Sequence, residues 1–325
     1  MRAARHWIIA HASVEDPAWQ AELPGLALPA LGDWLQQAAA PAEGHADPQA
    51  LAAPHEQALA RALGWPARAE GHPWAAWHAG RTDLPCAWLV PCHAEVSLDH
   101  LTLRPAQALA LTAEEAQALR DAWAPLAQEE GITLTEGGTP WRWLAQGEPF
   151  DGWRSASVVR VAHRRLDPAW QPGAAHAAGR RLRRLLEEAT MLWHTHPVNE
   201  ERAARGLPPI NALWVEGAGR WDGQGPPRAE AAVVLEEALA DAALAGDLQG
   251  WCAAWRALDA DLLAPALQAA RQDGLPRWLT LCGERGWRTW RLDPSAPAAP
   301  PAPRWWPWRR RAAAPAVAQP WWIGL

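Results

Sequence analysis

Lysine and tyrosine are absent from this sequence of 325 residues, so all 30 of its Lys and Arg residues are arginines. Without lysine the chain has no P-loop lysine, no nucleotide-binding lysine of the kinase type and no Schiff-base chemistry. Without tyrosine it has no phenolic acid or base. There are only five serines, and none lies in a Gly-x-Ser-x-Gly turn. These absences exclude several large classes of enzyme.

Cysteine is also scarce, and charge of either sign is not in large excess. The four cysteines form no Cys-x-x-Cys pair, which predicts reduced thiols and no structural metal. A formal charge of -6 gives no general attraction to nucleic acid. No apolar run approaches the roughly 20 residues that span a bilayer, and the short apolar run near the start is no secretory signal. We therefore expect a cytoplasmic protein with neither a nucleic-acid partner nor a membrane partner.

What the sequence does contain is enough apolar residues for a large core, in segments that alternate between strand and helix patterns. Hydrophobic residues make up 49% of the chain, and 25 of them are tryptophans, which we expect mainly to fill the core. Strands are predicted at 6–13, 86–98, 210–217, 278–283 and 288–292, with a hairpin at 132–145. Helices are predicted at 28–40, 54–64, 112–131, 180–196 and 229–246 and over most of 248–274. This alternation predicts an α/β fold with a mostly parallel sheet flanked by helices.

The composition changes near residue 294 and suggests a boundary. Residues 1–293 carry the strand and helix patterns, whereas 294–325 are rich in proline, alanine, tryptophan and arginine. Such a segment cannot bury a core of its own, so we predict one α/β domain followed by a tail. The cluster WWPWRRR in this tail leaves two alternatives to an inert tail: a protein partner, or contact with a membrane surface.

Polar residues gather in the segment HTHPVNEERAARGLPPINALWVEGAG, from His194 to Gly219. A helix ends near its histidines, Asn199 can cap a second short helix, and a strand begins at Ile210. Loops beyond the carboxyl ends of parallel strands are where ligands bind in α/β sheets. The segment is therefore either a ligand-facing connection or only a helix-to-strand connection held by caps and turns.

Other groups of polar or charged residues are candidate sites. His194 and His196 could hold a metal, but they diverge near a helix end and no cluster of carboxylates or cysteines lies beside them in the sequence. His93 and Glu95 lie close to Asp99 and His100 and offer an acid/base or metal group, against the simpler role of hydrogen-bonded strand histidines. Ser155 and Ser157 lack any nucleophile motif. The arginine doublets 180–181 and 183–184 are typical of a solvated helix face, with anion binding as the alternative.

The segment from His194 to Gly219 resembles the corresponding segment of cofactor-independent phosphoglycerate mutases of the archaeal type. More closely, residues 5–290 resemble a proteobacterial family of RpfE-type regulatory proteins, described as phosphoglycerate mutase-like. The residues that match the mutase segment, which are not the metal ligands of the mutases, are His196, Asn199, Arg202, Gly206, Asn211, Trp214, Gly217 and Gly219. The resemblance implies a reduced alkaline-phosphatase or phosphomutase-like core. In the mutases a hydroxyl nucleophile takes the phosphoryl group beside two metals held by Asp and His residues.

The chain departs from the mutases at the positions of this chemistry. The resemblance places an Asp-Gly metal motif directly after the first strand, where this chain has Ala10, His11 and Ala12. It also implies late histidines, and none occurs after His196. Two-metal phosphoryl transfer needs a full set of oxygen and imidazole ligands. We therefore expect no resident metal or other cofactor, and the catalytic residues stay unknown.

Three functions stay open from the sequence. The first is a regulatory or anion-binding protein that holds a phosphorylated or carboxylate small molecule. Its ligand-binding residues would be His196, Asn199, Arg202, Asn211, Gly217 and Gly219, since an arginine fork suits such a group. The second is an active mutase or phosphatase with a rearranged metal site that uses His11, His93, Asp99 and His100. The third is a scaffold or membrane-surface protein that acts through its Trp/Arg tail.

Overall fold

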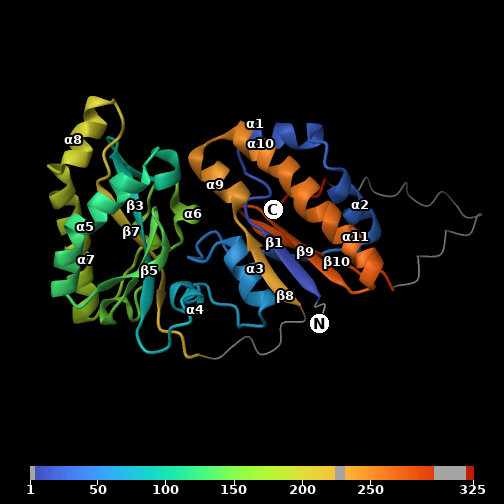
Figure 1. Ribbon diagram of the computed structural model, residues 1–325, viewed down its shortest axis with the longest axis horizontal. Helices are drawn as coiled ribbons and strands as arrows, with labels where there is room; N and C mark the ends of the chain where they lie inside the picture. Colours follow the sequence, from blue (N-terminus) through green and yellow to red (C-terminus); the bar gives the residue numbers. More distant parts are fainter. Residues whose placement is uncertain (1–3, 224–230, 296–319) are drawn as a thin grey trace, which may run out of the picture.

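The computed structural model describes residues 4–223, 231–295 and 320–325, and its strands form two sheets (Figure 1). Sheet A has the order β2-β10-β9-β1-β8. Its strands are β1 (Arg5–Ile9), β2 (Ala42–His45), β8 (Ala232–Glu236), β9 (Arg277–Cys282) and β10 (Gly286–Leu292). β1 is parallel to both β8 and β9, whereas β10 is antiparallel to β9 and β2. Sheet A is therefore mixed, with its parallel part around β1.

Sheet B is built from the middle of the chain, and all of its pairings are antiparallel. Its strands are β3 (Cys86–Val96), β4 (Leu101–Pro105), β5 (Thr133–Thr139), β6 (Arg142–Gln146) and β7 (Ala212–Gly219). The long strand β3 is at the centre and pairs with β4, β6 and β7. The α/β class with helices on the sheets is confirmed, while the sheets are mixed and antiparallel rather than mostly parallel.

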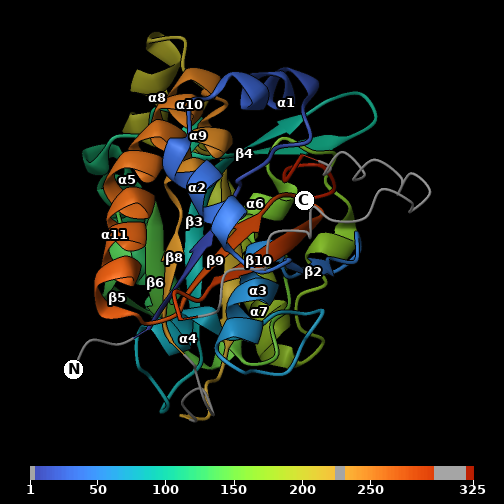
Figure 2. The same cartoon turned by 90° about the vertical axis from the view of Figure 1, so that its right-hand side faces the viewer.

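The alternation of side chains along β1 gives sheet A a core on each face. Trp7 and Ile9 point into one buried cluster and Ile8 into the other, as the two-residue period of a strand requires. The first cluster lies under α2 (Pro29–Gln37), α10 (Leu248–Ala257) and α11 (Ala264–Asp273), with a π-helical turn, η5 (Leu258–Leu263), between the last two. The second lies under α3 (Pro54–Ala62). Figure 2 shows β9 and β10 among these helices.

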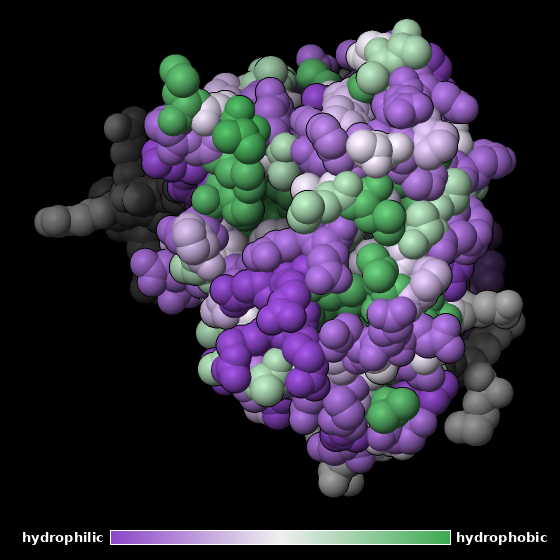
Figure 3. All heavy atoms as spheres, turned by 90° about the vertical axis from the view of Figure 1, so that its left-hand side faces the viewer, coloured by the Kyte–Doolittle hydropathy of each residue, from purple (hydrophilic) through white to green (hydrophobic). Residues whose placement is uncertain are grey.

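Two long helices cover the face of sheet B that is turned away from sheet A (Figure 1). They are α5 (Ala113–Glu129) and α7 (Ala177–His194), with α8 (Pro197–Ala204) following α7. The indole Trp123 Nε1 donates to Leu185 O, and Trp193 Nε1 donates to Leu119 O, so the helices exchange hydrogen bonds within the core. Thr112 and Glu115 form the predicted capping box at the start of α5. Figure 3 shows that the outer surface on this side is largely hydrophilic, and the arginine doublets of α7 are exposed as predicted.

Shorter elements complete the described chain. The helices are α1 (Pro17–Glu22), α4 (Trp74–His78), α6 (Val158–Val161) and α9 (Ala238–Ala245). The 3₁₀ turns are η1 (Leu23–Gly25), η2 (Ala106–Ala108), η3 (Glu148–Phe150) and η4 (Pro168–Trp170). All four cysteines are buried and free, as predicted. Within the described ranges no helix has the length and apolar character needed to cross a membrane.

The helix predicted at 229–246 is wrong over its first half. Residues Ala232–Glu236 form β8, which pairs with β1 in parallel, and the helix α9 begins only at Ala238. Alanine, leucine and glutamate favour a helix, but Val233 and Val234 fit a strand, and pairing with β1 satisfies its backbone. The predicted boundary at residue 294 is not tested, because most of the tail and its WWPWRRR cluster lie outside the described residues.

Candidate functional site

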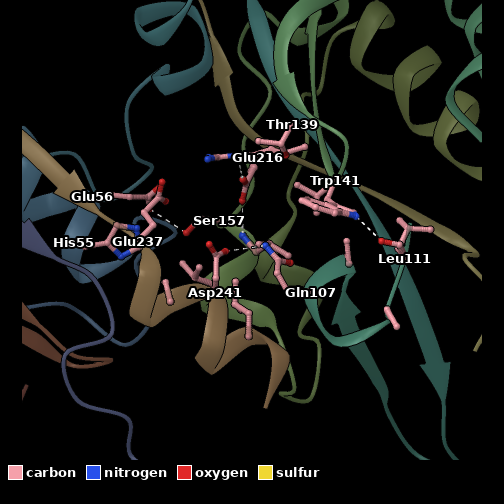
Figure 4. A pocket seen from close by; sticks show the side chains of 18 residues that line it. His55, Glu56, Gln107, Leu111, Thr139, Trp141, Ser157, Glu216, Glu237 and Asp241 are labelled. Atoms are coloured by element: carbon pink, nitrogen blue, oxygen red, sulfur yellow. Dashed lines mark hydrogen bonds and ion pairs between the residues drawn. The ribbon is translucent and has the colours of Figure 1, made fainter. Parts of the chain in front are cut away.

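A cavity of about 540 Å³ lies between sheet B and the helices α3 and α9, of which α3 packs on sheet A and α9 follows β8. We call it the cleft. Its walls come from α3, α6 and α9, from β3, β6 and β7, and from the turn before α5. Figure 4 shows His55, Glu56 and Glu237 gathered on one side, and Trp141 with Leu111 on the other. One side of the cleft is therefore ionisable and the other apolar.

Glu56 is positioned by the first turn of α3. Its Oε2 accepts a hydrogen bond of 2.6 Å from the backbone amide of Ala53 and one of 3.1 Å from Ser157 Oγ. A glutamate at this helix position commonly bonds the capping residue in this way. Burial raises the pKa of the Glu56 carboxyl to about 7, although the bond from Ala53 partly opposes that rise and the charge of Glu216 adds to it. Near neutral pH this group can give or take a proton.

Glu216 enters the cleft from β7 and is almost fully buried. Its Oε2 accepts a hydrogen bond of 2.6 Å from the backbone amide of Val158, which begins α6. Its Oε1 lies 2.9 Å from Arg142 Nε, and the Arg142 guanidinium lies over the Trp88 ring, 4.9 Å from its centroid. Arg142 and Glu216 therefore neutralise each other within the site.

Two further carboxyl groups come from the segment after β8. Glu237 follows the carboxyl end of this parallel strand, a position where ligands commonly bind in α/β sheets. Burial raises its pKa, although Arg142 opposes the rise. On α9, Asp241 accepts a hydrogen bond of 3.4 Å from Gln107 Nε2 of the opposite wall. These carboxyl groups face the cavity with fewer protein partners than Glu216 has.

The apolar side of the cleft is formed by Val90, Leu111, Trp141 and Leu244 together with several alanines. The Trp141 indole donates a hydrogen bond of 2.6 Å to Leu111 O, and Trp141 is 39% exposed. A flat apolar surface beside carboxyl groups suits a molecule that has both a polar and an apolar part.

His11 occupies the position directly after β1 where the sequence resemblance implies a metal-binding aspartate. It is buried, its backbone φ is 53°, and its Nδ1 has no hydrogen-bond partner among the described residues. Its ring lies 6.4 Å from that of His55, and burial lowers the pKa of both histidines. Across the described part of the chain, no three His, Cys, Asp or Glu side chains are grouped so that they could hold a metal ion.

The polar residues that the sequence predicts as ligand-binding residues in and around α8 form hydrogen bonds within the protein. His196 caps α8, because its Nδ1 accepts a hydrogen bond of 3.2 Å from the backbone amide of Val198. Asn199 donates from Nδ2 to Trp193 O and Ile210 O, and its Oδ1 accepts from the Ile210 amide. These bonds join the end of α7 to the start of the strand.

Arg202 is fully buried and holds three separate segments together. Its Nε donates to Pro208 O at 2.9 Å, Nη2 to Leu109 O at 2.7 Å and Nη1 to Glu115 Oε2 at 2.7 Å. Glu115 also pairs with Arg205, which is half exposed. An arginine with all of these partners has little left to offer a ligand.

Asn211 is paired with β3, since its side chain accepts from the Ala94 amide and donates to Ala94 O. Gly217 and Gly219 have φ values of 59° and 135°, and a side chain on Gly217 would approach Trp88 and α4. The six nominated residues thus lie along one connection. A ligand role for them stays a prediction, and their contacts give it no support.

The residues of the alternative metal site are not brought together. His93 Nδ1 lies 2.8 Å from Pro209 O, and Asp99 pairs with His100 in the exposed turn between β3 and β4. His11 lies on sheet A, against His55. Sequence reasoning missed Glu56, Glu216 and Glu237. The available signal was a glutamate within an apolar strand, LWVEG, whose burial implies a dedicated partner.

No family model and no curated protein matches the chain. Among solved structures, it is similar to a cofactor-independent phosphoglycerate mutase from Thermoplasma acidophilum DSM 1728, with 16% identity, a TM-score of 0.35 and 90% of each chain covered. It is also similar to the PH0037 protein from Pyrococcus horikoshii, with 13% identity, a TM-score of 0.47, and 90% of this chain and 88% of the other covered. Both likenesses are distant, and no function is transferred from them.

Proposed function

We propose that this chain is a phosphomutase-like protein that binds a small molecule in the cleft and acts in binding or regulation, not in phosphoryl transfer. The single observation that carries the proposal is the cleft itself, a cavity of about 540 Å³ with ionisable groups from α3, β7 and the segment after β8, and with an apolar wall. Pockets of this size and mixed lining are the usual sites for small ligands. The regulatory part of the proposal comes only from the resemblance of the sequence to RpfE-type proteins, since no family model and no curated protein matches the chain.

The charges in the cleft favour a ligand that donates hydrogen bonds. Arg142 is already paired with Glu216, so the carboxyl groups left to face a ligand are those of Glu56, Glu237 and Asp241. A phosphate would meet these carboxyl groups without a free cation to offset them, which is unfavourable. An amine or a polyhydroxylated molecule with an apolar part suits this lining. The phosphorylated or carboxylate ligand expected from the sequence is not favoured in the cleft.

Phosphoryl transfer finds no support in the donor groups of the described residues. His11 stands where a metal-binding carboxylate is implied, and His93, Asp99 and His100 lie elsewhere. A two-metal site needs several ligands within reach of ions about 4 Å apart. We expect no turnover of 3-phosphoglycerate in the presence of Mn²⁺ or Mg²⁺, measured with purified full-length protein.

A thermal-shift screen tests the binding proposal. Amines, amino alcohols and polyamines form one panel, and phosphorylated metabolites and carboxylates form the opposing panel. At saturating concentrations a member of the first panel should raise Tm, because a ligand that binds only the folded state stabilises it. The double variant Glu237→Gln, Asp241→Asn should lose most of that rise, whereas the exposed control Glu95→Gln should keep it.

Two results would overturn the proposal. One is that no member of the first panel shifts Tm while an anion does so. The other is that the double variant responds as the parent protein does, which would place the ligand away from the cleft.

A further inference from the structure

The segment Pro320–Leu325 lies against sheet A, although residues 296–319 before it are not described (Figure 2). Leu325 is only 4% exposed and belongs to the main core of sheet A, and Trp321 and Trp322 pack against the same core. Ile323 stays exposed. An apolar segment packed in this way is bound to the protein surface like a short peptide.

One glycine makes room for this segment. Gly283 follows β9 directly, and a Cβ added there would lie 2.5 Å from the backbone carbonyl carbon of Leu325 and 2.7 Å from its Cβ. The backbone of Gly283 is not in the left-handed region, so an alanine there meets Leu325 but no conformational strain.

Aromatic contacts hold the other end of the segment. The ring of Trp321 lies 5.4 Å from that of Trp255 at 63°, and 5.4 Å from that of Trp322 at 86°. Edge-to-face pairs at such distances are favourable beyond the area that they bury. Arg288 Nη1 donates a hydrogen bond of 3.0 Å to Trp321 O. The backbone bonds within the segment are local, from Ile323 N to Pro320 O and from Leu325 N to Trp322 O, so it adds no strand to the sheet.

The bound segment covers the carboxyl end of β9, beside the end of β1. The amide of Ala12 donates to Cys282 O at 2.7 Å, which ties the turn after β1 to the residue before Gly283. Trp251, which packs on Trp255, donates to His11 O at 2.9 Å. In α/β sheets this edge is where ligands gain access. The segment therefore occupies the part of this edge that lies away from the cleft.

We propose that the surface around Gly283, Trp255 and Arg288 is a peptide-binding site, and that the chain fills it in cis with its own residues 320–325 as a detachable cap. The contacts are side-chain packing and one arginine hydrogen bond, as in complexes of short apolar peptides. This site is separate from the cleft, so it does not depend on the proposed ligand.

The first test uses variants of the full-length protein. Gly283→Ala should lower Tm by about 5 °C. The reason is that the added methyl group displaces Leu325, Trp321 and Trp322, which then lose their buried apolar contacts. The same variant should also make Trp321 and Trp322 sensitive to chymotrypsin. The control is Gly25→Ala, where no atom lies within 4 Å of an added Cβ, and it should change neither measurement.

The second test asks whether Gly283 and Leu325 affect stability through their contact with each other. Leu325→Asp should release the segment, and Gly283→Ala added to Leu325→Asp should then cost little more, since neighbouring residues are not additive. Equal costs of Gly283→Ala in both backgrounds would overturn the proposal. So would full chymotrypsin resistance of Gly283→Ala with an unchanged Tm.

The third test supplies the segment in trans. The full-length Leu325→Asp variant, whose own segment is released, should bind the synthetic peptide PWWIGL and recover at least half of its lost Tm, whereas PWWIGD should not bind. Binding is measured by calorimetry, and the mass of the full-length protein by size-exclusion chromatography with light scattering. No binding of PWWIGL overturns the site, and a dimer that dissociates on Leu325→Asp overturns capping in cis.

Discussion

The connection from His194 to Gly219 and the cleft are both rich in polar side chains, but those side chains face different things. In the connection, the side chains of Asn199 and Arg202 donate their hydrogen bonds to backbone carbonyls and to Glu115. In the cleft, Glu237 and Asp241 line a cavity. A cluster of polar residues in the sequence therefore does not distinguish a ligand-binding site from a structural connection. The two are distinguished by the number of hydrogen bonds that the protein itself makes to those residues.

Replacing Arg202 should have the largest effect on stability. Arg202→Met leaves Glu115 and the carbonyls of Leu109 and Pro208 without a buried partner, which should cost about 3–5 kcal/mol. Arg205→Met removes a half-exposed arginine from the same carboxylate and should cost less than about 1 kcal/mol. Urea unfolding of both variants measures the difference. Similar small costs, together with lost binding of an anion, would instead make Arg202 a ligand residue.

Asn199→Ala should come next in size. The change removes three hydrogen bonds that are buried between α7 and β7, and it takes from the Ile210 amide and the Ile210 carbonyl their side-chain partner. A cost of about 2–3 kcal/mol is expected from the desolvation of such groups. The matched control is Asn211→Ala, whose bonds to Ala94 are only half-buried and should matter less. Equal costs would mean that burial does not separate the two asparagines.

Glu56→Gln should have a smaller effect that depends on pH. The pKa of Glu56 is raised to about 7, so between pH 4.5 and 7 the folded protein keeps a proton that the unfolded chain releases. This group therefore destabilises the fold as pH rises through that window. Glutamine cannot ionise, so the variant should gain up to about 2 kcal/mol over the parent between pH 5 and pH 8.

Unfolding in urea at several pH values measures this gain. The comparison with the parent is needed because the lowered pKa values of His11 and His55 act in the opposite sense below pH 6.5. A difference between variant and parent that stays constant from pH 5 to pH 8 would show that Glu56 ionises normally.

Much of the fold could be predicted from local sequence. The capping box of Thr112 and Glu115, the long helix before His194 and the buried first strand all follow from patterns within a few residues. Strand β8 could not, because its residues favour a helix until β1 pairs with them. The order of strands within the two sheets depends on contacts between distant parts of the chain.

The cleft was beyond prediction for the same reason. Glu56, Glu216 and Glu237 lie far apart in the sequence and meet only when α3, β7 and the end of β8 are assembled. The candidate residues of the segment from His194 to Gly219 lie close together in the sequence, so the pattern could be recognised from the sequence alone. About half of their hydrogen bonds are to residues of the same segment. A prediction based on the local density of polar residues therefore points to the connection, and not to the cleft, as the ligand-binding site.

Hydrogen exchange tests the central claim most directly. Full-length protein is compared with and without the molecule that raises Tm most in the screen, and exchange of the backbone amides is followed by mass spectrometry. The account predicts slower exchange in α3, α6 and α9, which line the cleft. Protection confined to residues 196–211, with no change around the cleft, would contradict it.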